Sequence, residues 1–118
     1  MAKLGGNLRC VVVDSARDNI RSLFTEIFGA TVSHPTDAMD VFSFGGSNIG
    51  FDFVAADKAL NETQHREMGT WIEIAVADAA ATETRLGARG MARLEVSEQD
   101  HSYFQIPDGP VFRLANPA

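Results

Sequence analysis

The sequence predicts an α+β fold of two βαβββ modules, each a curved mixed sheet with one helix packed on its convex face. One observation is an internal repeat: a strand, an Asp, a helix, a Gly and three strands follow one another twice. A second is the alternation of apolar and polar residues in the closing segment 101–115, which indicates a hairpin. Because each helix buries its apolar stripe on a sheet face, we expect the opposite faces to form a cup-shaped cavity.

The 118 residues are expected to form a single domain, with repeat 1 at about 7–54, a linker at 55–69 and repeat 2 at about 70–115. The formal net charge of −6, without a basic run, argues against nucleic acid or an anionic membrane as partner. The single cysteine, Cys10, can build neither a disulfide framework nor a zinc cluster. No apolar run approaches the ~20 residues of a membrane span, so we expect a cytoplasmic protein.

The first repeat begins with an apolar, β-branched run at 7–14 that predicts a buried strand. Asp14 or Ser15 is expected to cap the next helix, and Gly29 to end it in the left-handed conformation. The helix carries a wide apolar stripe, made of Ile20, Leu23, Phe24, Ile27 and Phe28. Strands are then expected at 30–34, 40–45 and 49–54, the last two joined by a turn at 46–48.

The second repeat follows the polar stretch 55–69, in which at most a turn of helix is expected near residues 58–60. The segment 70–77 alternates like a strand, with Trp71 and Glu73 on one face. Asp78 is expected to cap an Ala-rich helix to about residue 86, ended by Gly87 or Gly90. A strand is expected at 91–96, before the closing hairpin.

In that hairpin, His101, Tyr103 and Gln105 are expected on one face of the strand. The turn at 107–109 is expected to use Gly109 for a positive φ. The hairpins at 42–53 and 103–114 align residue for residue, which matches Asp52 with Arg113.

Three segments carry a resemblance to a known superfamily: CVVVDSARDNIRSLFTEIFGATV, WIEIAVAD and YFQIPDGPVFRLA. They resemble the vicinal oxygen chelate superfamily, which includes glyoxalase I, bleomycin-resistance proteins, fosfomycin-resistance enzymes and extradiol dioxygenases. The resemblance covers nearly the whole chain and implies the βαβββ fold and a homodimer. It does not specify a function, because the superfamily contains isomerases, lyases, dioxygenases, transferases and non-catalytic drug-binding proteins.

The resemblance also implies metal ligands on the inner strands. The residues at the four ligand positions are Asn7, Asp52, Trp71 and Arg113. Only Asp52 is an ordinary ligand for a hard cation, since Trp has no lone pair to offer and Arg is a fixed cation that repels a metal. We therefore expect no metal site and no cofactor.

The residues expected to line the cup are Asn7, Arg9, Asp52, Trp71, Glu73, His101, Tyr103, Gln105 and Arg113. Arg113 either clamps a ligand carboxylate or phosphate, or pairs with Asp52 or Glu73. Trp71 either stacks on a planar ligand or packs in the space that a metal would fill. Glu73 is a general base or an ion-pair partner, and His101 an acid–base group or a rim residue.

Three further residues are expected to have no role in a site. His34 and His65 are expected in solvent, because neither has a second ligand at metal spacing. Cys10 is expected on the helix-covered side of its strand, as part of the core. No residue is assigned a catalytic role.

The first functional hypothesis is a metal-independent protein that binds a small organic molecule in the cup. The alternative is a lyase, isomerase or dioxygenase that uses a divalent metal, which would need Asp52, Glu73 and His101 together. A third is an interaction module without a ligand.

Overall fold

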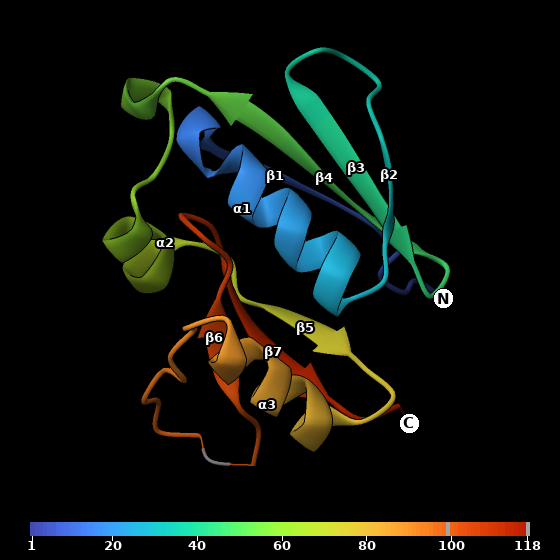
Figure 1. Ribbon diagram of the computed structural model, residues 1–118. Helices are drawn as coiled ribbons and strands as arrows, with labels where there is room; N and C mark the ends of the chain where they lie inside the picture. Colours follow the sequence, from blue (N-terminus) through green and yellow to red (C-terminus); the bar gives the residue numbers. More distant parts are fainter. Residues whose placement is uncertain (99, 118) are drawn as a thin grey trace. The chain divides into compact units, whose positions relative to one another are not determined.

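The computed structural model describes residues 1–98 and 100–117, which form two compact units, Met1–Ala59 and Leu60–Ala118 (Figure 1). Each unit contains one mixed sheet and the helix that its repeat predicts. The α+β prediction is confirmed. The cup-shaped cavity and the single domain 1–118 stay predictions.

The first unit contains a four-stranded sheet in the order β1-β4-β3-β2. Strand β1 (Asn7–Val13) lies parallel to β4 (Ser47–Val54), and β3 (Met39–Phe44) pairs antiparallel with β4 and with β2 (Thr31–Ser33). This pattern is that of one βαβββ module.

A continuous helical segment connects β1 to β2, made of η1 (Asp14–Ala16), α1 (Arg17–Ser22) and η2 (Leu23–Ile27). No side chain caps η1 or α1, so the prediction of a cap at Asp14 or Ser15 is wrong. The chain leaves β1 directly into a 3-10 turn, and Asp14 lies inside this turn. Gly29 has a φ of 68°, which confirms the left-handed residue after the helix.

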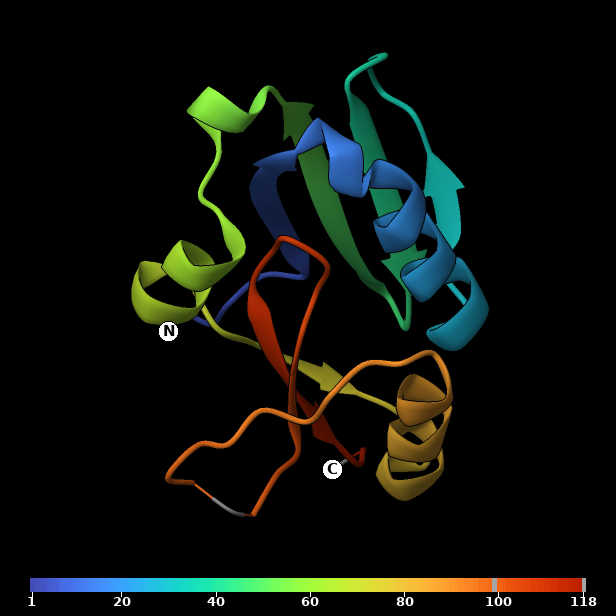
Figure 2. The same ribbon diagram turned by 60° about the vertical axis from the view of Figure 1, so that its left-hand side comes forward.

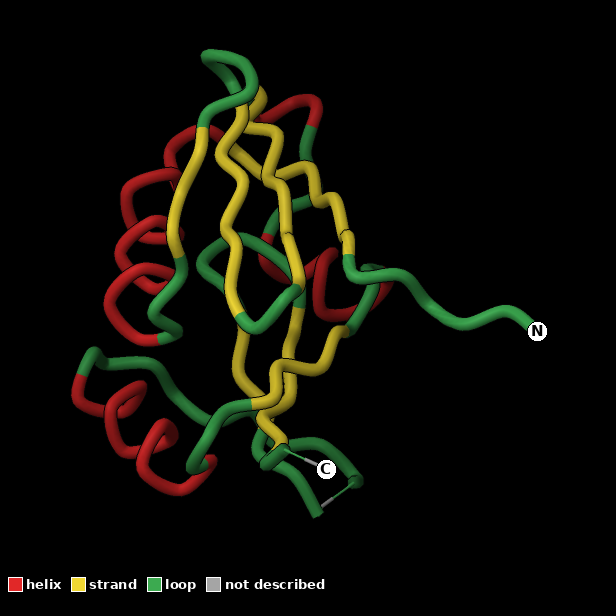
Figure 3. The backbone as a smooth tube through the Cα atoms, turned by 90° about the vertical axis from the view of Figure 1, so that its right-hand side faces the viewer, coloured by secondary structure: helices red, strands yellow, loops and turns green. Residues whose placement is uncertain are grey.

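An aromatic cluster joins this helix to the sheet of the first unit. Phe24 is fully buried, and its ring stacks on Phe42 with a centroid distance of 5.0 Å and meets Phe51 edge-on at 5.5 Å. Phe28 stacks on Phe44 at 6.1 Å. The helix therefore covers one face of the sheet (Figure 3), and the opposite face is the open face of the first unit.

The hairpin between β3 and β4 turns at Gly45 and Gly46, one residue earlier than predicted, since Phe44 pairs with Ser47. Both glycines have positive φ, at 57° and 80°. A two-residue hairpin turn of type I′ requires positive φ at both positions, and glycine adopts it without strain.

The second unit begins after η3 (Ala56–Lys58) with the helix α2 (Glu62–Met68), in the stretch expected as a linker. Asn61 and Gln64 form a complete capping box: the Asn61 side chain accepts from Gln64 N, and the Gln64 side chain accepts from Asn61 N, both at 2.9 Å. The Asn-x-x-Gln spacing is a signal in the sequence that predicts a helix start.

The sheet of the second unit has the order β5-β7-β6 (Figure 2). Strand β5 (Ile72–Ala75) lies parallel to β7 (Val111–Ala115), and β6 (Tyr103–Gln105) pairs antiparallel with β7. Between β5 and β6 lies α3 (Ala79–Ala88), which Asp78 caps as predicted by accepting from Ala81 N at 3.0 Å.

The strand expected at 91–96 does not form in the part of the chain that the structure describes; a single bridge pairs Leu94 with Tyr103. This segment is largely a loop between α3 and β6. No side chain of residues 91–98 is fully buried, so the segment lacks the buried apolar face that holds a strand on a sheet.

The β6–β7 hairpin turns through residues 106–110, with the positive φ of 52° at Asp108 rather than at Gly109. This turn is three residues longer than the one at Gly45 and Gly46. The residue-for-residue alignment of the two hairpins is therefore wrong on their first strands, β3 and β6. Because side chains alternate along a strand, a shift by three residues places each aligned residue on the opposite face of its sheet.

Among the described residues, no helix combines the length and the apolar character needed to cross a membrane.

Candidate functional site

Three charged or polar side chains lie side by side on one face of the sheet in the second unit. Glu73 on β5 and Tyr103 on β6 are both directly opposite Arg113 on the central strand β7. Neighbours in register point to the same side of a sheet. The other side carries the buried residues Phe104 and Phe112 and is the side of α3, where the Ser102 hydroxyl donates to Glu83 at 2.7 Å. The face of Glu73, Tyr103 and Arg113 is the open face of the second unit.

Arg113 is already paired on this face. Its Nε donates to Glu73 Oε2 at 2.7 Å, and the two side chains keep 36% and 46% of their surface exposed. Hydrogen bonding to Tyr103 and Glu73 raises the pKa of Arg113 further above its ordinary value. Of the two sequence-based alternatives for Arg113, the ion pair with Glu73 is thus present.

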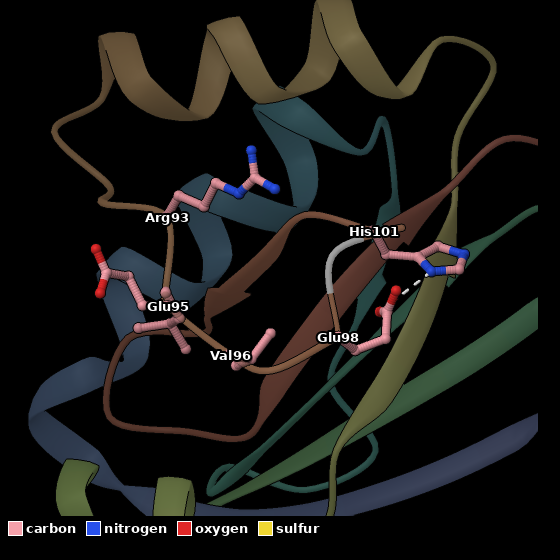
Figure 4. A pocket seen from close by; sticks show the side chains of 6 residues that line it. Arg93, Glu95, Val96, Glu98 and His101 are labelled. Atoms are coloured by element: carbon pink, nitrogen blue, oxygen red, sulfur yellow. Dashed lines mark hydrogen bonds and ion pairs between the residues drawn. The ribbon is translucent and has the colours of Figure 1, made fainter.

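Glu98, in the loop before β6, connects this pair to two further side chains. Its Oε2 lies 3.3 Å from His101 Nδ1 (Figure 4). The same oxygen accepts from the Tyr103 hydroxyl at 2.8 Å and lies 4.0 Å from Arg113 Nη1. The Tyr103 hydrogen bond is the largest cause that holds the pKa of Glu98 below its usual range, and His101 adds to it. Glu98 therefore remains a carboxylate and fixes the loop on the open face.

Trp71 adds an aromatic wall beside Tyr103, with ring centroids 5.6 Å apart and the planes tilted by 55°. The indole Nε1 donates to the Arg66 carbonyl on α2 at 3.2 Å, so its single polar atom is satisfied. Yet 43% of the residue is exposed. What Trp71 offers to solvent is thus an apolar, electron-rich ring.

Gln105 shares the sheet side of Tyr103, as predicted, but its amide nitrogen is used within the protein, and its Oε1 is buried without a partner among the described residues. Its Nε2 donates to the Glu62 carbonyl of α2 at 2.7 Å and to the Gly109 carbonyl at 3.0 Å. The helix α2 thus packs against this end of the open face. Gln105 holds the helix there and has no free donor for a ligand.

A pocket of about 470 Å³ lies next to the same network, along the loop between α3 and β6 (Figure 4). Its lining residues are Arg93, Leu94, Glu95, Val96, Glu98 and His101. Glu98 and His101 belong both to the pocket and to the open-face network.

The open face of the first unit has a simpler set of contacts. Arg9 on β1 forms an ion pair with Asp52 on β4. Asn48 donates to Asn7 Oδ1 at 2.9 Å and accepts from the Ser43 hydroxyl at 2.6 Å. These hydrogen bonds join neighbouring strands across this face.

The strand register corrects the match between the two repeats. When Asp52 is aligned with Arg113, Phe51 corresponds to Phe112. Phe51 pairs with Cys10 on β1 and Phe112 pairs with Ile72 on β5, so Cys10 corresponds to Ile72. Trp71, one residue before Ile72, therefore corresponds to Arg9 and not to Asn7. Counting back from the Asp before each helix gives the wrong match, because the chain between strand and helix is two residues longer in the second repeat.

Among residues 1–98 and 100–117, no group of three or more His, Cys, Asp or Glu side chains could hold a metal ion. The residues at the expected ligand positions are also engaged in ways that do not suit a metal. Trp71 is a donor to a carbonyl, Arg113 is a cation, and Asp52 is paired with Arg9. As they are paired in the described residues, these three side chains do not fit a metal centre.

Sequence reasoning missed a buried cluster in the first unit. Asp40 is fully buried and accepts from Arg17 Nη2 at 2.7 Å and Arg21 Nη2 at 3.1 Å, with His34 Nδ1 at 2.7 Å. Burial by itself would raise the pKa of Asp40, but the hydrogen bonds from Arg17, His34 and Arg21 outweigh it and lower the pKa. His34 is half exposed, as a partner of this carboxylate. The signal was the alternation of Asp40 with Phe42, which places Asp40 on the core side.

His65 was expected in solvent, and this prediction is wrong. It lies on α2 with 5% of its surface exposed, and its Nε2 has no partner among the described residues. Burial lowers the pKa of His65, and the nearby Asp108 opposes this shift. Cys10 is partly buried, and burial raises the pKa of its thiol to about 11.

No family model matches this sequence, and no curated protein sequence is similar to it. Solved structures are similar in fold. A protein assigned to the glyoxalase family, from Bacillus anthracis, has a TM-score of 0.73 at 10% identity, with 100% of this chain and 98% of that chain covered. The fosfomycin resistance protein FosX from Listeria monocytogenes, solved with Mn(II) and sulfate, has a TM-score of 0.72 at 14% identity, with 100% and 93% covered.

An integron cassette protein from V. cholerae has a TM-score of 0.69 at 12% identity, with 100% of this chain and 99% of that chain covered. At such identities the likeness establishes the fold. This chain has the fold of the vicinal oxygen chelate superfamily, as the sequence resemblance implied.

Proposed function

We propose that the open face of the second unit binds a small organic molecule without a metal ion. The observation that carries the proposal is an exposed indole next to an assembled polar network. Trp71 keeps 43% of its surface exposed although its Nε1 is satisfied, and it contacts Tyr103, which is bonded to Glu98. An exposed aromatic wall beside fixed polar groups is typical of small-molecule sites.

The proposal without metal is supported by what each potential ligand already bonds. The metal-dependent alternative needs Asp52, Glu73 and His101, and these are engaged by Arg9, Arg113 and Glu98. Releasing a carboxylate to a cation would leave an arginine without its partner. FosX from Listeria monocytogenes was solved with Mn(II), so a shared fold does not by itself decide the matter.

The experiment is a thermal-shift screen of chelator-treated protein against a panel of metabolites, with metal analysis of untreated protein. We expect at least one compound to raise the melting temperature and less than stoichiometric metal. Stoichiometric zinc, nickel, manganese or iron would contradict the proposal. Failure of every compound would favour an interaction module.

The proposal includes two expectations from the sequence, a cytoplasmic location and a homodimer. A mass measurement by light scattering during gel filtration tests the second, and a monomer at micromolar concentration would contradict it. Fractionation of cells that express the protein tests the first.

A further inference from the structure

We propose that the molecule bound on the open face of the second unit is a planar organic cation, such as an amidinium or a protonated aromatic amine. This inference rests on the proposed function and adds the chemical class of the ligand. It follows from three properties of the network: its charge, the state of its arginine, and the aromatic wall.

The first property is a negative charge balance. At pH 7, the carboxylates of Glu73 and Glu98 and the guanidinium of Arg113 give a formal charge of −1, with His101 neutral. The adjoining pocket adds Arg93 and Glu95, which cancel each other. A ligand with one positive charge therefore neutralises the site.

The second property is that Arg113 has its counter-ions already. Glu73 Oε2 lies 2.7 Å from its Nε and Glu98 Oε2 lies 4.0 Å from its Nη1. An anionic ligand would have to compete with both carboxylates for the guanidinium. By contrast, Glu73 Oε1 accepts no hydrogen bond from any described residue and is half exposed, so it is available to a ligand N–H.

The third property is the exposed ring of Trp71. Because its Nε1 donates to the Arg66 carbonyl, the ring has no polar atom left for a ligand. The face of an indole attracts cations and stacks on planar groups. A flat cation can thus stack on Trp71 and donate a hydrogen bond to the Glu73 carboxylate at the same time. A flat anion can stack on the ring, but the Glu73 carboxylate repels it.

Trp71 is the only tryptophan of the chain, so quenching of its fluorescence reports binding at this face. We would titrate chelator-treated protein with three probes that share one ring and differ in charge: benzamidinium, benzamide and benzoate. We expect benzamidinium to bind about tenfold more tightly than benzamide, and benzoate to bind most weakly.

The matched variants are Glu73→Gln on the face and Glu67→Gln on the exposed side of α2, where Glu67 has no side-chain partner among the described residues. Glu73→Gln should weaken benzamidinium binding about tenfold and benzamide binding much less, because only benzamidinium loses a charge-assisted contact, and the remaining quenching by benzamide shows that the variant is folded. Glu67→Gln should change neither.

Equal affinities for the three probes, or tightest binding of benzoate, would overturn the cation inference and leave the proposed function intact. Absence of quenching by all three probes would also overturn the inference. The metabolite screen and the metal analysis then decide the proposed function separately, because that function fails when no compound of any charge binds or when the protein holds stoichiometric metal.

Discussion

The open faces of the two units carry the same kind of ion pair with its polarity reversed. In the first unit the carboxylate, Asp52, is on the last strand and its partner Arg9 on the first. In the second unit the cation, Arg113, is on the last strand and Glu73 on the first, directly opposite. Each unit thus has a charge pair across its two parallel strands, with opposite signs at the matching last-strand positions Asp52 and Arg113, although Arg9 and Glu73 lie two residues apart in the matched first strands.

The surroundings of the two pairs differ more than the pairs themselves. Arg9 is 71% exposed, and Met39 fills the space over Gly50 beside Asp52. Arg113 instead belongs to a network that reaches Glu98 in a loop. The difference teaches that a charge pair on a sheet is not enough to mark a site. The loop and the aromatic wall around the second pair are what favour binding there.

The core sides show a second contrast. Asp40 lies opposite Phe51, and Phe104 lies opposite Phe112 at the matching place in the second unit. One unit therefore has a buried carboxylate where the other has a phenyl ring. In the first unit, two arginines satisfy Asp40, and Arg17 also lies over the Phe53 ring at 4.9 Å.

The largest expected effect is the loss of stability when the buried carboxylate of Asp40 is replaced. Asp40→Asn should lower the free energy of unfolding by about 3 kcal/mol, because it removes the charge that Arg17 and Arg21 share. The estimate is at the low end for buried pairs, since both arginines reach solvent. Urea unfolding followed by circular dichroism measures it.

The control is Asp57→Asn, on the exposed turn η3, which removes one negative charge as well and should have little effect on stability.

The pH dependence of the unfolding free energy gives a second test of Asp40. Because the pKa of Asp40 is lower in the folded state, its stabilisation is present above about pH 4 and lost as pH falls through the folded pKa. An Asp40→Asn variant with unchanged stability would refute the assigned role of the cluster.

The next largest effect is expected on ligand affinity when the ring of Trp71 is removed. Trp71→Ala should weaken benzamidinium binding about fivefold, measured by calorimetry because the variant has no tryptophan. Met68→Ala, an exposed apolar residue at the end of α2, is the control and should leave the affinity unchanged. Equal affinities in the two variants would remove Trp71 from the site.

A smaller effect is expected at His65. Because burial lowers its pKa in the folded state, the stabilisation is present above about pH 6.5 and lost as pH falls through the folded pKa. Hydrogen exchange, corrected for the intrinsic rate at each pH, should therefore show smaller protection factors for the α2 amides in acid. His65→Phe should abolish this acid sensitivity, and an unchanged pH profile in that variant would refute the assignment.

The smallest effect is on thiol reactivity. With a pKa of about 11, Cys10 should be thiolate in about a thousandth of the molecules at pH 8. Reaction with a disulfide reagent should therefore be slow in folded protein and fast after denaturation. Equal rates in both states would place Cys10 at the surface.

The regular elements with strong apolar alternation were predictable from the sequence. The strands around Val12 and Phe51, the helix capped by Asp78 and the left-handed Gly29 all have local causes. The helix α2 also has a local cause, the capping box of Asn61 and Gln64. Where the local signal is strong, propensity and tertiary structure agree.

The site was predictable only in part. Alternation placed Glu73, Tyr103 and Arg113 on one face, and the structure brings these three together. Glu98 was missed because it comes from a loop, where no period indicates which way a side chain points. Gln105 was placed on the right face, but sequence could not show that α2 covers it.

The most direct test of a metal-free site on the second unit is a titration of Trp71 fluorescence with benzamidinium, with and without a chelator. The two dissociation constants should agree within about twofold, because every group that contacts the ligand belongs to the protein. Binding that disappears in the chelator and returns with an added divalent ion would contradict the account.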